Sequence, residues 1–218
     1  MIHIIRSIFV IIALIMLTSC ATQKNVKLSE NFWNNPKQKI ALATASVATK
    51  PQLYQHGYQG LLEIAISRAM NKQLNSHLMQ TDLMWYQKLA SNFAAKLNER
   101  GISTKIDTQL NVNEKNYSQI ASRAGSDKVL VIQLEAIGAV RNYYGLIPIN
   151  APQAYCVLSG KLINTSNNQV LWSYQTKVIR PVEGKWDQPP HYPELDHAIK
   201  IAINTAEHEL IDSFFSGH

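Results

Sequence analysis

The chain of 218 residues has only two cysteines, no run of one charge and no long apolar segment. Two cysteines are too few for a structural zinc site of the all-cysteine kind. The lysines and arginines are scattered, so the net charge of +6 forms no nucleic-acid patch. The longest apolar run, residues 8–17, has half of the roughly twenty residues that a membrane-spanning helix needs. The composition, 46% apolar and 17% charged, is that of a globular domain.

Common catalytic motifs are also missing. The sequence has no G-x-S-x-G nucleophile elbow, no glycine-rich phosphate loop and no H-E-x-x-H zinc motif. We therefore predict no catalytic residue, no metal and no cofactor. An envelope hydrolase stays open as an alternative, and it would require polar groups that converge in a cleft with His191 or His197.

The N-terminus has the form of a signal peptide. Arg6 gives it a basic start, residues 8–17 form its apolar core, and small residues lead to a cysteine. The segment Leu17-Thr18-Ser19-Cys20 resembles a bacterial lipobox, which has an aliphatic residue, two small residues and Cys.

The lipobox resemblance implies how the chain is processed and where it resides. Cleavage would follow Ser19, and Cys20 would carry a diacylglycerol on its sulfur and an acyl chain on its new amino group. Several acyl chains together anchor a protein firmly, because each buried methylene contributes about 0.8 kcal/mol. Ala21 is not the Asp that resembles an inner-membrane retention signal, so we expect the outer membrane.

We therefore divide the chain into a signal peptide (1–19), a lipidated cysteine with a polar tether (20–37) and one domain (38–218). Phe32 and Trp33 interrupt the tether, and we favour their docking on the domain over a place at the membrane interface. Lipidation of Cys20 leaves Cys156 without an intrachain partner. Its apolar neighbours favour a small buried side chain over an intermolecular disulfide.

Hydrophobic periodicity predicts an α/β domain. We expect a mixed sheet of about five strands packed against helices, with one face of the helix at 61–80 (Leu62, Ala65, Ile66, Ala69, Met70 and Leu74) in the core. Gly57 and Gly60 mark a loop, and residues 142–153 and 181–193 mark two more. The expected strands are 39–49, 102–112, 128–141, 154–164 and 169–182, and the expected helices are 61–80, 81–100, 117–124 and 193 onward.

Two loops carry exposed-looking apolar side chains of the kind that protein interfaces use. As the alternative, these side chains fold back over the edge of the sheet. The candidate partner-binding residues are Tyr143, Tyr144, Leu146, Ile147, Trp186, His191 and Tyr192.

Two stretches resemble a known family. The segment 125–131 (GSDKVLV) is similar to the entry to the central strand in periplasmic assembly lipoproteins, and 162–172 (LINTSNNQVLW) is similar to their hairpin. This group includes the curli secretion channel lipoprotein, the LpoB activators and TolB amino-terminal-like domains. Asn164 and Asn168 stand where the family usually has Asp and Gly. The resemblance implies no cofactor and no catalytic residues, and the chain lacks the long insertions that a channel would need.

These observations predict a non-catalytic outer-membrane lipoprotein on the periplasmic face. It would serve as an accessory or assembly factor of an envelope or secretion machine, held to the membrane by lipid and bound to an envelope protein, with a homo-oligomer as a further expectation and no nucleic acid as partner. The alternative is a periplasmic binding module for a lipid or peptidoglycan fragment, which predicts a deep apolar pocket between helix and sheet.

Overall fold

The long strand β4 (Lys128–Tyr144) organises the sheet of this computed structural model, which describes residues 25–35, 38–46, 50–82, 84–107, 112 and 116–216. Its start, Val129–Ile132, is apolar and buried, as suits a strand that is covered on both faces. One side of β4 pairs with two parallel strands in succession, and the other side pairs with two antiparallel strands, one long and one of two residues. The other strands are β1 (Lys39–Ser46), β2 (Gln52–Tyr58), β3 (Ser103–Asp107), β5 (Ile147–Pro148), β6 (Gln153–Asn164) and β7 (Gln169–Pro181).

The sheet is mixed and runs in the order β3-β1-β4-β6-β7, with β2 and β5 added at the far end of β4. The β6–β7 hairpin turns at residues 165–168, where Asn168 adopts the left-handed conformation (φ 56°) that asparagine tolerates. The predicted fold class and hairpin are thus confirmed.

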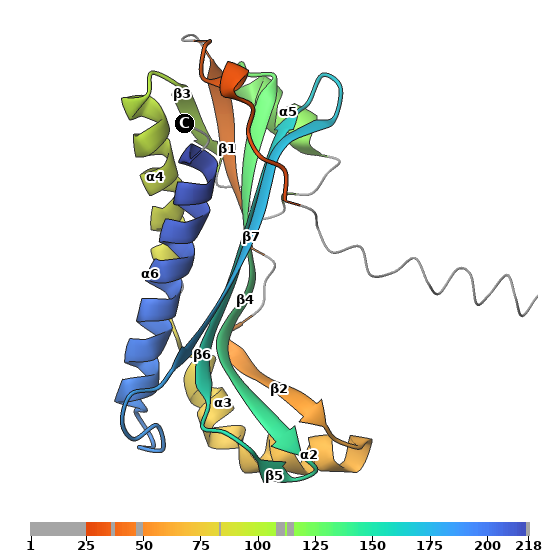
Figure 1. The fold of residues 1–218 in the computed structure, drawn as a ribbon, viewed down its shortest axis with the longest axis vertical. Helices are drawn as coiled ribbons and strands as arrows, with labels where there is room; N and C mark the ends of the chain where they lie inside the picture. The colour runs from red at the N-terminus through yellow and green to blue at the C-terminus, as the bar shows by residue number, and fades with distance from the viewer. Residues whose placement is uncertain are drawn as a thin grey trace, which may run out of the picture.

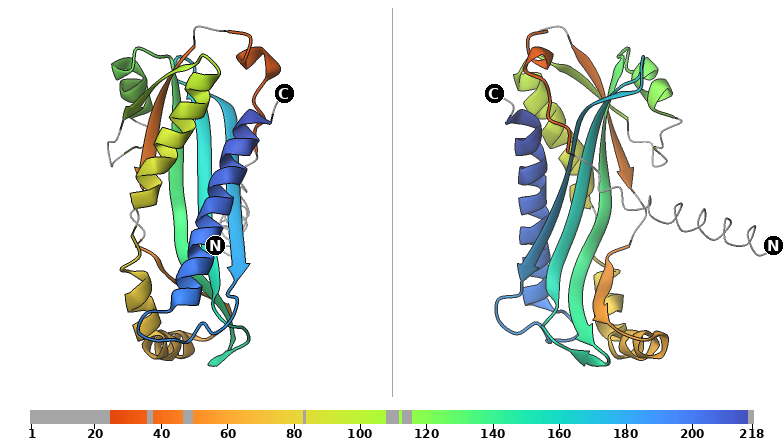
Figure 2. Two further views of the ribbon diagram at one scale, coloured as in Figure 1. Left: turned by 90° about the vertical axis from the view of Figure 1, so that its left-hand side faces the viewer. Right: turned by 45° about the vertical axis from the view of Figure 1, so that its right-hand side comes forward.

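Two long helices lie side by side along one face of the sheet, and α5 lies on the other (Figures 1 and 2). The helices expected at 81–100 and from 193 onward are present, and each buries one apolar stripe. The buried residues are Tyr86, Leu89, Ala90, Phe93, Ala94 and Leu97 in the first and Ile199, Ile203, Ala206, Leu210 and Phe214 in the second. The helices are η1 (Glu30–Phe32), α2 (Leu61–Met70), α3 (Lys72–Leu78), α4 (Met84–Glu99), α5 (Tyr117–Arg123) and α6 (Pro193–Phe215). None of the helices in the described segments is long and apolar enough to cross a bilayer.

The main core lies between the sheet and the α4–α6 pair. Phe214 is fully buried there, and its ring meets Trp172 at 4.9 Å and Phe93 at 5.7 Å between centroids, both edge-on. Cys156 is buried in the same core, and burial raises the pKa of its thiol to about 12. The buried position predicted for this cysteine is confirmed.

The segment before β1 is packed on the domain. Val26 pairs with Ser173 at the edge of β7, and Phe32 is buried in the main core. Trp33 stacks near Phe215, and the guanidinium of Arg100 lies 5.1 Å from the Trp33 ring. The favoured docking of Phe32 and Trp33 is thus confirmed.

The parallel neighbour of β4 changes from β1 to β2 beside the buried Tyr86. The Tyr86 hydroxyl lies 2.7 Å from the carbonyl oxygens of Ala45 and Ile132, and it accepts a hydrogen bond from the Leu134 amide at 3.2 Å. These bonds satisfy backbone groups where the ladder is interrupted. Burial raises the pKa of Tyr86 above its usual range.

Residues 52–58 form a strand where the sequence predicted a loop around Gly57. The glycines at 57 and 138 make this pairing sterically feasible. A side chain on Gly57 would lie 2.1 Å from the Tyr143 carbonyl oxygen, and one on Gly138 would lie 2.2 Å from the Gln52 carbonyl oxygen. Both glycines have positive φ (111° and 133°). The sequence indicated a loop at Gly57, whereas this glycine allows the backbones of β2 and β4 to approach each other closely.

Two further predictions need correction, and parts of two others cannot be compared with the structure. The helix expected at 61–80 is interrupted at Asn71, and most of its apolar stripe is exposed. The loop expected from 142 begins three residues later, because β4 runs to Tyr144 and then pairs with β5. Parts of the predicted first and second strands, residues 47–49 and 108–111, lie outside the described residues.

Candidate functional site

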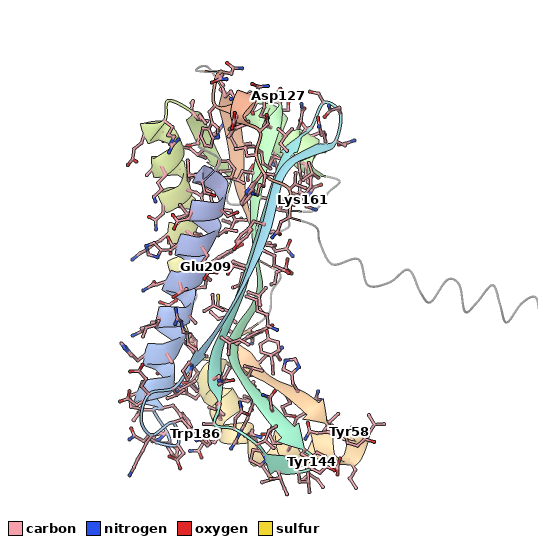
Figure 3. All side chains as sticks on the ribbon, viewed as in Figure 1. Tyr58, Asp127, Tyr144, Lys161, Trp186 and Glu209 are labelled. Carbon is pink, nitrogen blue, oxygen red and sulfur yellow. The ribbon has the colours of Figure 1, made fainter. Side chains whose placement is uncertain are left out.

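Large apolar side chains are exposed together at one end of the molecule. We call this set the apolar end surface, and Figure 3 shows two of its members, Tyr58 and Tyr144, at the end opposite Asp127. Leu61 is 90% exposed and Tyr58 is 82% exposed. The members are Tyr58, Leu61, Leu62, Ile66, Met70, Tyr144, Leu146, Ile147 and Ile149.

The two segments that carry this surface are joined by hydrogen bonds. The Gly145 amide donates to the Tyr58 carbonyl at 2.8 Å, and the Gln59 side-chain amide donates to the Gly145 carbonyl at 3.0 Å. The rings of Tyr58 and Tyr144 stack with centroids 6.5 Å apart. The start of α2 and the β4–β5 turn therefore form one continuous surface.

Helix α2 turns its polar side inward. Ser67 is its only buried residue. The Ser67 hydroxyl donates to the Gln55 side-chain oxygen at 3.1 Å and accepts from the Gln59 side-chain amide at 3.3 Å. A hydroxyl buried among amides keeps its hydrogen bonds, so this polar contact replaces the usual apolar packing.

The polar contact continues through Asn71, which is also buried. Its side-chain nitrogen donates to the Tyr143 hydroxyl at 2.7 Å, and its side-chain oxygen accepts from Arg141 at 3.4 Å. Arg141 comes from the neighbouring β4 and lies over the Tyr143 ring at 5.7 Å. This network holds the helix through its polar side, and the large side chains of its apolar stripe, Leu62, Ile66 and Met70, are exposed.

Nine large side chains exposed to this degree present on the order of 1,000 Å² of surface, whereas the largest apolar patch on a typical monomer is about 300–600 Å². Contiguous patches above that size usually mark an interaction site. The apolar end surface is therefore the candidate functional site.

The structure brings the two loops predicted to bind partners to the same end of the molecule, where Trp186 is also labelled in Figure 3. Arg141 links them, because its guanidinium lies 4.8 Å from the Trp186 ring as well as over Tyr143. Tyr144, Ile147 and Leu146 are exposed, as expected.

Two of the predicted residues do not have the expected exposure. Tyr143 and Tyr192 are 3% and 4% exposed, so neither offers its ring to a partner in this conformation. Tyr143 points inward because its hydroxyl bonds Asn71, and Tyr192 packs on His77 at 5.1 Å. Trp186 is half-buried, and His191 is exposed.

Sequence reasoning missed the α2 part of the surface, although a signal was present. The side of the helix opposite the apolar stripe carries Ser67, Asn71 and Asn75 at intervals of four residues. Solvated helix faces usually carry charged side chains. Small polar residues in their place indicate that this side is buried among hydrogen-bond partners.

A polar groove of about 650 Å³ lies beneath α2, between β2 and the α2–α3 helices. Its side chains are mainly amides, hydroxyls and bases, in contrast to the deep apolar pocket that a lipid-binding module predicts. The space between the sheet and α4–α6 is filled by buried side chains. His191 and His197, named for a hydrolase, are exposed and do not line this groove.

Other predicted site residues lie outside the described part. Ser19, Cys20 and Ala21 precede residue 25, so lipid attachment and sorting stay predictions. Within the described segments, no group of three or more metal-binding side chains is close enough together to hold an ion.

No family model matches the chain, and no curated protein matches it in sequence. Several solved structures resemble it. A PelC dodecamer from Paraburkholderia phytofirmans is 11% identical over 88% of this chain and 95% of its own, with a TM-score of 0.40. Protein XCC0632 from Xanthomonas campestris is 13% identical over 88% and 92%, with a TM-score of 0.43.

The C-terminal domain of LpoB from Salmonella enterica, from the group that the sequence resembles, is also among these structures. It is 14% identical over 64% of this chain and 81% of its own, with a TM-score of 0.23. At these identities and TM-scores, the likeness says nothing about what this chain binds.

Proposed function

We propose that the chain is an outer-membrane lipoprotein, anchored through Cys20, that acts without catalysis as an accessory factor of an envelope or secretion machine. It would do so by binding an envelope protein through the apolar end surface. The size of that surface is the observation that carries the proposal. Its area of about 1,000 Å² exceeds the ~800 Å² that each partner contributes to a standard protein interface.

The occupant that we propose is a protein rather than a lipid surface. The acyl chains expected on Cys20 already supply stable anchoring, since two lipid chains suffice to hold a protein on a bilayer. The stacked pair Tyr58 and Tyr144 also has the chemistry of an interface, because tyrosine is enriched among the residues that dominate binding energy.

The proposal is tested with a photo-crosslinking amino acid at Leu62, introduced into the full-length protein in its native cells. The matched control position is Asn167, which is exposed on the β6–β7 turn at the other end of the molecule. We expect one dominant adduct from position 62 and none of that mass from 167. Mass spectrometry then identifies the partner.

Purified lipoprotein and partner are next mixed, and the affinity is measured for the wild type and two variants. Leu62→Ser should weaken binding more than tenfold, because burying a leucine is worth about 1.5–3 kcal/mol and 1.4 kcal/mol is a factor of ten. Arg68→Gln, on the groove side of the same helix, should leave the affinity unchanged. An adduct of twice the chain's mass, a lipid adduct, or no adduct would each overturn the proposed protein partner.

A further inference from the structure

We infer that the polar groove beneath α2 binds a carboxylate-bearing glycan chain. The groove runs beside β2 and is closed on its other side by α2 and α3. None of the fourteen residues that line it is acidic, and five carry side-chain amides. This lining is independent of the apolar end surface, which lies on the opposite side of α2.

The groove offers hydrogen-bond donors. The oxygen of the Gln55 side chain accepts from Ser67, and that of Asn75 accepts from the Leu53 amide at 3.0 Å. These bonds orient both amide groups through their oxygens and leave their NH₂ groups without a bond to another described residue. Fixed amide donors suit the hydroxyl and carboxylate oxygens of sugars.

The groove also carries positive charge that the described residues do not neutralise. Arg68 and Lys72 line it from α2 and α3, are exposed, and have no carboxylate within ion-pair distance in the described segments. Guanidinium groups bind carboxylates through two parallel hydrogen bonds, which is the strongest such contact. A ligand that matches this groove therefore carries carboxylates.

The shape of the groove favours a chain-like ligand. Residues 52–57 all line it, a span of about 20 Å at ~3.3 Å per strand residue. An extended peptide fits less well, because Asn75 already occupies the Leu53 amide on the free edge of β2. A glycan needs no such backbone partner.

The test uses full-length lipidated protein in micelles of a neutral detergent, with titration calorimetry. The probe is the hexamer of galacturonic acid, and its matched control is the same hexamer with every carboxylate methyl-esterified. We expect binding of the acid and at least tenfold weaker binding of the ester. A peptide-free muramic acid tetrasaccharide, probed in the same way, distinguishes cell-wall glycan from other acidic glycans.

Variants decide whether this groove is the site. The pair Arg68→Gln with Lys72→Gln should reduce the affinity at least tenfold. The control pair, Lys88→Gln with Lys96→Gln on exposed positions of α4, removes the same charge and should have no effect.

Absence of binding to both carboxylated probes, equal binding of acid and ester, or an equal loss in the control pair would overturn the inference. Leu62→Ser should leave glycan binding intact, so a failure here is separable from a failure of the proposed protein contact.

Discussion

Helices α6 and α2 both pack on strands of one sheet, but they turn opposite faces to it. Nine residues of α6 are buried, all of them apolar. In α2 only Ser67 is buried, and Leu62, Ile66 and Met70 of its stripe are exposed. Apolar packing therefore holds α6 on the sheet, whereas hydrogen bonds hold α2.

This contrast shows what each end of the molecule is for. The α4–α6 face is a filled core that stabilises the fold. At the other end, a polar network around Ser67 and Asn71 holds α2 in place, so its apolar face stays available for a partner. The same residue types therefore serve stability in one helix and recognition in the other.

The largest stability effect should come from α6. Phe214→Ala removes a ring that packs against Trp172, Phe93 and Phe32 in the main core. We expect a loss of about 3–5 kcal/mol in the free energy of unfolding, because truncating a buried phenylalanine leaves a cavity. Denaturant melts measure this loss, and a change below 1 kcal/mol would mean that α6 is not the main stabilising helix.

An intermediate effect should come from the network beneath α2. Asn71→Ala leaves the Tyr143 hydroxyl and Arg141 without their partner. A buried polar group left unpaired costs about 1–3 kcal/mol. Thermal melts should show this loss, and Asn71→Ala should also expose α2 to proteolysis. Full stability in this variant would show that α2 is held by something other than the polar network.

The thiol of Cys156 provides a pH test of the core side. Its pKa is raised by burial from 9.0 to about 12, so its contribution to stability is complete below pH 9 and is lost as pH rises from 9 to 12. Between pH 8 and 10 the wild type should lose about 1 kcal/mol more than Cys156→Ala. Parallel pH profiles for the two proteins would contradict a buried neutral thiol.

The smallest effect should come from the apolar face of α2. Leu62→Ser should change the free energy of unfolding by no more than about 0.5 kcal/mol, because exposed positions contribute little to folding. The matched comparison is Leu210→Ala in α6, which should cost about 2–5 kcal/mol. A large loss in Leu62→Ser would show that this leucine is buried in the folded protein.

The sequence predicted α4, α6 and the β6–β7 hairpin well. In both helices the apolar stripe is the face that packs in the core, and the asparagines at the turn favour a hairpin. The sequence mispredicted α2 because periodicity identifies the residues that share a face but not the direction in which that face points. The face that α2 turns toward the sheet is set by hydrogen bonds from Ser67 to Gln55 and from Asn71 to Tyr143. Gln55 is on β2 and Tyr143 is on β4, so the helix's own periodicity does not reveal these partners.

The partner-binding loops show the same limit. The sequence predicted this strand only as far as residue 141, and Tyr143 is buried because its hydroxyl bonds Asn71, which lies 72 residues earlier in the chain. The strand at 52–58 was hidden for a related reason. Its glycine at 57 signals close approach to another strand, and that strand lies 86 residues later, at Tyr143.

The central claim, that the apolar face of α2 is covered by a partner in the envelope, is tested most directly by methionine oxidation. Met70 lies on that face and is 69% exposed. Peroxide treatment of purified protein and of intact envelopes, followed by peptide mass spectrometry, gives the fraction of sulfoxide at Met70 relative to a methionine-containing reference peptide added to both samples. We predict that this normalised fraction falls severalfold in envelopes; an unchanged fraction would contradict the account.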